Sequence, residues 1–173
     1  METRADRLAR AVRDHPVVIE ARTGHRCERG AHSYLGDGRV VCWVVPSVRG
    51  PAGAGSHGAA AAPGIADDVE AGDPPLAHAV DAELALQSVP SGVASRWRGK
   101  GFADEGQFWE LWCATEVLAK LADVPVVVLV RRGPVTTSPA HRGHLEVHWL
   151  VQRMGELVVV HGLSWATTTP EVT

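Results

Sequence analysis

The stretch from His144 to Gly162 constrains the fold more than any other, because it alternates as a β-strand does. From Leu145 to Val151 the odd positions are apolar, whereas most even positions are polar. Successive side chains of a strand point to opposite faces, so this pattern predicts a half-buried strand. A second run of β-favouring residues, 157–160, follows a predicted tight turn at Met154 and Gly155. The sequence therefore predicts a C-terminal β-hairpin.

The length of the turn decides which residues of this hairpin face each other. With a two-residue Met154-Gly155 loop, His148 lies opposite His161, and both share a face with His144 and Glu146. Leucines and a valine occupy the same face, so we expect another part of the chain to cover it. The long helix or the 49–75 insertion would provide that cover. Partial cover shifts pKa values and favours a functional site; the alternative is a solvated face on which the histidines have no role.

The remaining pattern predicts an α+β fold. Helices are expected at about 3–14, 76–88 and 103–122, strands at 17–21, 39–48 and 126–130, and loops at 23–38, 90–101 and 131–143. With the hairpin this gives about five strands in a mostly antiparallel sheet and about three helices, packed in two layers. A three-layer α/β arrangement is the alternative, because two of the strands are apolar at every core position.

Length and composition predict a single domain spanning residues 1–173, with a flexible insertion rich in Gly, Ala and Pro at about 49–75. A net charge of −3 gives no reason to expect a nucleic-acid partner or an anionic membrane surface. Three cysteines form no disulfide framework, and the N-terminus lacks an apolar signal segment. A cytoplasmic protein is the expectation.

The first functional hypothesis is a thiol hydrolase or acyl transferase. Cys113 on the long helix would be the nucleophile, His148 its base, and His161 the group that orients the base. This order of helix and two strands resembles that of papain-like enzymes over about residues 104–162. In those families the nucleophile begins its helix, where the dipole lowers the thiol pKa, whereas Cys113 lies near the middle. A buried, inert thiol is the alternative for Cys113.

The second hypothesis is a metal site. His144, Glu146 and His148 are spaced by two along one strand, so they project to one side, and His161 would be a fourth ligand. Two histidines and a carboxylate suit Fe or Zn; without such a site no cofactor is predicted. A separate group, comprising His25, Cys27, His32 and Cys42, also has the donors that zinc prefers, although its spacing fits no common zinc finger.

The third hypothesis is a non-catalytic binding or regulatory module. Six tryptophans are many for 173 residues, and tryptophan is enriched at protein interfaces. The segment 96–100, Arg-Trp-Arg-Gly-Lys, is positively charged and would suit the binding of phosphate or of an acidic surface. The alternative is that it lies in a solvated loop and binds nothing. The partner would be an unknown small molecule, peptide or protein.

Overall fold

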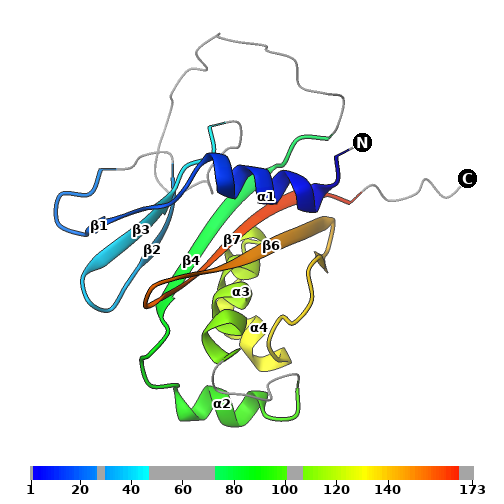
Figure 1. Cartoon of the computed structure of the whole chain (residues 1–173). Coiled ribbons are helices and arrows are strands. Elements are labelled where there is room, and N and C mark those ends of the chain that lie inside the picture. Colours follow the sequence, from blue (N-terminus) through cyan, green and yellow to red (C-terminus); the bar gives the residue numbers. More distant parts are fainter. Residues whose placement is uncertain (1, 27–29, 47–72, 101–106, 168–173) are drawn as a thin grey trace, which may run out of the picture.

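The computed structural model describes residues 2–26, 30–46, 73–100 and 107–167, and its larger sheet has four antiparallel strands (Figure 1). In spatial order these are β4 (Ala77–Leu84), β7 (Leu157–Ala166), β6 (Leu145–Met154) and β5 (Ala140–Arg142). The long β6–β7 hairpin, predicted from sequence, is the centre of this sheet. Every residue of β7 from Leu157 to Trp165 is buried, because the sheet is covered on both faces.

A smaller antiparallel sheet comprises β1 (Val18–Ala21), β3 (Arg39–Trp43) and β2 (Ala31–Tyr34), in that spatial order. Ala31, Val41 and Trp43 belong to a buried cluster shared with the larger sheet. Because side chains alternate along a strand, the residues between them point to the other face of the smaller sheet. That outer face carries His32 and Cys42.

One face of the larger sheet packs against α3 (Phe108–Leu121), while α4 (Val126–Arg132) packs against α3 and α2 (Ser91–Trp97) packs against α4. The core between them contains Cys113, Val117, Val147 and Val160, among others. The contact is closest at Gly162, where an added Cβ would lie 2.3 Å from Cγ1 of Val117. The absence of a side chain at this position of β7 thus allows α3 to approach the sheet.

The other face is covered by the N-terminal helix α1 (Arg4–Asp14) together with the smaller sheet (Figure 1). Thr3 and Asp6 form a capping box that satisfies backbone N–H groups at the start of α1. The helix buries Leu8 and Val12 and ends before Pro16, which cannot continue it. One expectation was that the long helix covers the hairpin face that carries His148 and His161. In the structure, the N-terminal helix and the smaller sheet cover that face instead.

The α+β class and the C-terminal hairpin are confirmed, but five local predictions were wrong. Residues 77–84 form a strand and not a helix, whereas 126–132 form a helix and not a strand. The predicted loops at 23–38 and 90–101 contain β2 and α2, and β5 lies within the predicted loop 131–143. The described chain therefore has seven strands in two sheets and four helices. Most of the predicted insertion, residues 49–72, and the expected helix start at 103–106 lie outside the described residues.

The hairpin register differs from the predicted one by two residues. Met154 pairs with Leu157, so the turn is Gly155-Glu156, and Gly155 adopts a positive φ of 60°. His161 is consequently opposite Leu150, and His148 is opposite Leu163. Since the side-chain period of a strand is two, this slip keeps His148 and His161 on the same face while separating the predicted pair.

Candidate metal centre

The smaller sheet brings together a histidine and a cysteine from adjacent strands. His32 of β2 lies directly opposite Cys42 of β3 in the antiparallel ladder. Both point away from the larger sheet, because Ala31 and Trp43, their neighbours along the strands, face the core. Cys42 is nevertheless only 3% exposed, so this outer face is covered near the thiol.

A third donor comes from the segment that follows β1. His25 lies beside His32, with ring centroids 4.9 Å apart and the rings nearly perpendicular. One ligand atom from each of His25, His32 and Cys42 lies within 4.8 Å of the others. Nε2 of His25 is buried and has no hydrogen-bond partner in the part of the chain that the structure describes. A buried nitrogen left without a partner is costly unless something binds it.

The carboxylate of Glu20 fixes the orientation of His25. Nδ1 of His25 contacts Oε1 of Glu20, a residue on the outer face of β1. Histidines that bind metals usually donate the other ring N–H to a carboxylate or carbonyl, which sets the tautomer and the ring orientation. With Nδ1 protonated and bonded to Glu20, Nε2 carries the lone pair that a metal ion requires.

The chemistry of these donors narrows the choice of metal. Cysteine thiolate with neutral imidazole is the ligand combination of zinc sites, whereas Ca²⁺ and Mg²⁺ prefer oxygen. Bond lengths of about 2.0–2.3 Å in a tetrahedral zinc site place its ligand atoms about 3.3–3.8 Å apart. The three donor atoms, within 4.8 Å of one another, reach that spacing with small movements. Cys27, named with this group from the sequence, lies outside the described residues.

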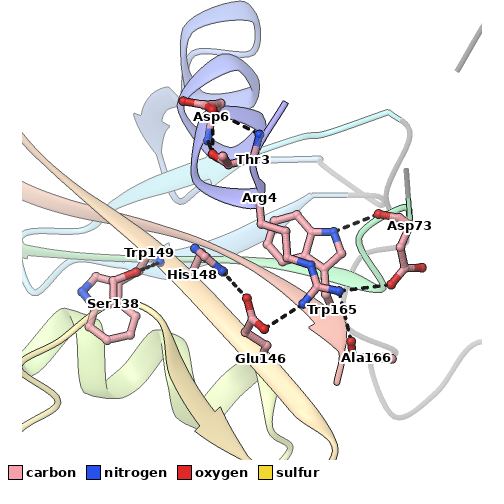
Figure 2. Close-up of polar contacts among 10 residues, drawn as sticks. All are labelled: Thr3, Arg4, Asp6, Asp73, Ser138, Glu146, His148, Trp149, Trp165 and Ala166. Carbon is pink, nitrogen blue, oxygen red and sulfur yellow. Dashed lines mark hydrogen bonds and ion pairs between the residues drawn. The ribbon is translucent and has the colours of Figure 1, made fainter. Parts of the chain in front are cut away.

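Two hairpin residues of the predicted metal set, Glu146 and His148, form a different network on β6. Nε2 of His148 is 2.6 Å from Oε1 of Glu146, and Nη1 of Arg4 donates to Oε2 of the same carboxylate at 2.8 Å (Figure 2). The hydrogen bond from His148 lowers the pKa of Glu146, and the charge of Arg4 adds to this effect. Arg4 also donates to Asp73 and to the carbonyl of Ala166 (Figure 2). This network joins α1 to the hairpin.

The structure does not bring Cys113 together with the two histidines. Cys113 is buried in the core between α3 and the sheet, whereas His161 contacts Trp43 on the other face at a ring-centroid distance of 4.7 Å. Burial raises the pKa of the Cys113 thiol well above its usual value, and nearby Asp81 reinforces this shift. The larger sheet thus separates a protonated thiol from the base that the predicted triad assigns to it.

His161 and His144 also lie in surroundings unlike those expected. Burial lowers the pKa of His161 to about 4, and its Nε2 donates to Oε1 of Gln152 at 2.9 Å. His144 is exposed in the turn between β5 and β6. Among the residues of the predicted hairpin metal site, the structure therefore brings His148 into contact with Glu146.

His25, His32 and Cys42 were named from the sequence, but several charged residues that form polar contacts in the structure were not identified. Glu20 was visible only as one acid in a predicted strand, and Arg4 as one of many charges in a predicted helix. Asp81 was assigned to a helix; it is instead a buried residue of β4 that accepts hydrogen bonds from Lys120 and Ser33. Lys120 Nζ also donates to the carbonyl of Val80 at 2.9 Å, so these contacts fasten β2 and α3 to the edge of the larger sheet.

Comparisons with protein-family models, with curated proteins and with solved structures find no match to this chain. In the described residues, no helix is long and apolar enough to cross a membrane. Any assignment of function must therefore start from the chemistry of the residues themselves.

Proposed function

We propose that this protein binds one zinc ion through His25, His32 and Cys42, and that the ion fastens the segment after β1 to the smaller sheet. The observation that carries the proposal is the convergence of these three donor atoms within 4.8 Å of one another. The contact between Glu20 and Nδ1 of His25 supports it, since it leaves Nε2, which is buried without a hydrogen-bond partner among the described residues, as the ring nitrogen able to bind a metal ion.

Burial of the donors favours a structural ion over a catalytic one. The side chain of His25 is 8% exposed, and Cys42 is 3% exposed. A catalytic zinc keeps a coordination position open to water and substrate, whereas a structural site is closed by protein ligands. The inner face of the smaller sheet packs against the larger sheet, so an ion that holds the outer face stabilises the whole assembly. The proposed role is therefore a zinc-stabilised, non-catalytic module.

The first experiment measures zinc content and thermal stability of the purified protein after zinc loading. We expect one equivalent of zinc, a higher Tm with zinc than after chelation, and loss of both properties in Cys42→Ser. Cys113→Ser is the matched control, because Cys113 is equally buried but lies on the far side of the larger sheet. Equal loss of zinc in both variants, or no stoichiometric zinc in the unaltered protein, contradicts the proposal.

A cobalt-substituted sample provides a readout that does not depend on variant folding. Co²⁺ in a tetrahedral site with a thiolate ligand gives intense visible bands and a sulfur-to-metal charge-transfer band. We expect both in the unaltered protein and in Cys113→Ser. If Co²⁺ shows only the weak visible absorption of an octahedral site and no sulfur-to-metal charge-transfer band, then Cys42 does not bind the metal.

Cys27→Ser tests whether the site is closed. Cys27 follows His25 by two positions in the sequence, so the chain holds the two Cα atoms within about 7 Å of each other. If Cys27 is a fourth ligand, its replacement weakens zinc binding as strongly as Cys42→Ser does. Unchanged zinc affinity would leave metal binding intact but contradict a closed, structural site.

A further inference from the structure

The C-terminal ends of α2 and α4 meet at the end of the molecule farthest from α1 (Figure 1). Nε1 of the buried Trp97, in the last turn of α2, donates to the carbonyl of Val130 in the last turn of α4 at 2.9 Å. Lys100 packs against Gly133, where an added Cβ would lie 3.4 Å from Cβ of the lysine. These contacts hold two short basic segments side by side.

The two segments present five exposed cations, here called the basic end: Arg96, Arg98, Lys100, Arg131 and Arg132. They are five of the 17 Lys and Arg residues of the chain. None of them forms an ion pair within the described residues. By contrast, Arg4, Arg39 and Arg153 each pair with a carboxylate. In a protein of net charge −3, such a group of cations is a local excess of positive charge among the described residues.

Exposed apolar side chains lie next to these cations on α4. Val127 is 49% exposed and Val128 is 37% exposed. They precede Arg131 and Arg132 by four residues each, so each valine lies one helical turn from an arginine on the same side of α4. Leu129 and Val130 bury the remaining face against the core. The exposed surface of α4 is thus both basic and apolar.

We propose that the basic end binds an acidic, amphipathic segment of a partner protein. Carboxylates of the partner would pair with the arginines, and apolar side chains would cover Val127 and Val128. This surface lies on the opposite side of the larger sheet from the zinc donors, so the proposal is independent of zinc binding.

Two other polyanions fit less well. A nucleic-acid backbone would pair with the cations but would gain nothing from the valines, and the described residues around the basic end include no exposed aromatic ring for base stacking. An anionic membrane favours longer amphipathic helices with bulky apolar anchors, whereas α4 has seven residues and exposes only valines. An acidic protein segment uses both the charge and the apolar area.

The test uses a fluorescein-labelled synthetic peptide in which Asp and Glu alternate with Leu and Phe, and the full-length protein. Fluorescence anisotropy should show binding that weakens when NaCl is raised from about 0.05 to about 0.5 M. Reversing two charges, Arg98→Glu with Arg131→Glu, should weaken binding about tenfold. The double variant Val127→Ser with Val128→Ser should weaken it several-fold with a smaller change in salt dependence.

The matched control reverses two exposed arginines of α1, Arg10→Glu with Arg13→Glu, which changes the net charge equally at the far end of the molecule. This control should bind the peptide as the unaltered protein does. Equal weakening in both charge-reversal variants, or no binding of the peptide, overturns the proposal. Tighter binding to a single-stranded oligonucleotide or to phosphatidylserine vesicles than to the peptide overturns it as well.

Discussion

His32 lies directly opposite Cys42 across the β2–β3 ladder, and neither residue can leave this pairing without breaking the smaller sheet. In the proposed zinc site, the two strands would therefore hold one nitrogen ligand and one sulfur ligand in place before the metal binds. His25 differs, because it lies in the segment after β1 and depends on Glu20 for its orientation. The affinity of the proposed site should consequently depend on Glu20.

We expect Glu20→Gln to weaken zinc binding about 10–100-fold, the usual effect of removing an outer carboxylate that orients a ligating histidine. A competition titration against a chromophoric chelator measures the affinity. Glu156→Gln is the control, since Glu156 is also an exposed acid that contacts a basic side chain, Arg39. Unchanged affinity in Glu20→Gln would show that the Glu20–His25 contact does not support metal binding.

Gly162→Ala should destabilise the fold by about 1–3 kcal/mol, the usual cost of forcing an extra methyl group into a packed core. The new Cβ would lie 2.3 Å from Cγ1 of Val117 and 3.0 Å from Leu121, so α3 must shift away from β7. Gly92→Ala is the control: the added methyl group meets nothing within 4 Å, and alanine favours the helix α2. The urea concentration at the midpoint of unfolding should fall for Gly162→Ala and rise for Gly92→Ala. Equal midpoints for the two variants would refute the close packing of α3 on β7.

His161 should make the protein acid-sensitive. Burial lowers its pKa from 6.5 to about 4 in the folded state. The unfolded chain therefore binds a proton that the folded chain does not, between these two values. The contribution of His161 to the free energy of unfolding is therefore fully present above pH 6.5, the unfolded pKa. It falls by about 3 kcal/mol in total as the pH drops from 6.5 towards 4.

The free energy of unfolding, measured by urea titration at several pH values, checks this expectation. His161→Gln removes the titrating group while keeping a donor for Gln152, so the variant should lose less stability over this pH range than the unaltered protein. His144→Gln, at an exposed turn position, should retain the original pH dependence. Parallel pH profiles for His161→Gln and the unaltered protein would contradict the expectation.

The Arg4–Glu146 ion pair should contribute to the docking of α1. Both side chains are partly buried, and the atoms Nη1 and Oε2 are 2.8 Å apart. A double-mutant cycle with Arg4→Ala and Glu146→Gln should give a coupling free energy of about 0.5–1 kcal/mol. Arg10→Ala, which removes the exposed pair with Glu2, should cost less. Additive effects of the two substitutions would show that the pair contributes nothing to stability.

The carboxylate of Glu146 should make the free energy of unfolding depend on pH in a second range, which is more acidic than that of His161. The pKa of Glu146 is lowered in the folded state, first by the hydrogen bond from His148. Its stabilising effect is present above the ordinary carboxyl pKa and is lost as the pH falls through the lower folded value. Glu146→Gln should flatten the stability profile in this range, while leaving the His161 range unchanged.

Sequence alternation predicted the faces of the β6–β7 hairpin but not its register. Alternation with a period of two is unchanged by a slip of two, so it cannot distinguish a turn at Met154-Gly155 from one at Gly155-Glu156. The same limit explains why His148 and His161 share a face without being opposite each other. The prediction that Gly155 lies in the turn is confirmed. Whether Gly155 is the first or the second residue of the turn depends on its φ angle, which the periodicity of the sequence does not reveal.

Local propensity failed where tertiary packing decides the structure. Ala77–Leu84 is rich in helix-favouring alanine, yet it pairs with β7 along its whole length and buries both faces. Val126–Val130 is rich in β-branched residues, yet it forms α4 after Pro125. An apolar run of five residues is compatible with either structure from its pattern alone. β2 was missed because its four residues are mostly polar or small, and this miss hid the pairing of His32 with Cys42.

The position of α1 has a consequence for the order in which contacts can form. Arg4 binds the carboxylate of Glu146 and the carbonyl of Ala166, which are 142 and 162 positions away in sequence. Contacts between residues so far apart require the closure of a long loop, which costs chain entropy before the contact contributes any stability. The docking of α1 on the hairpin should therefore be a late step of folding, after the hairpin itself has formed.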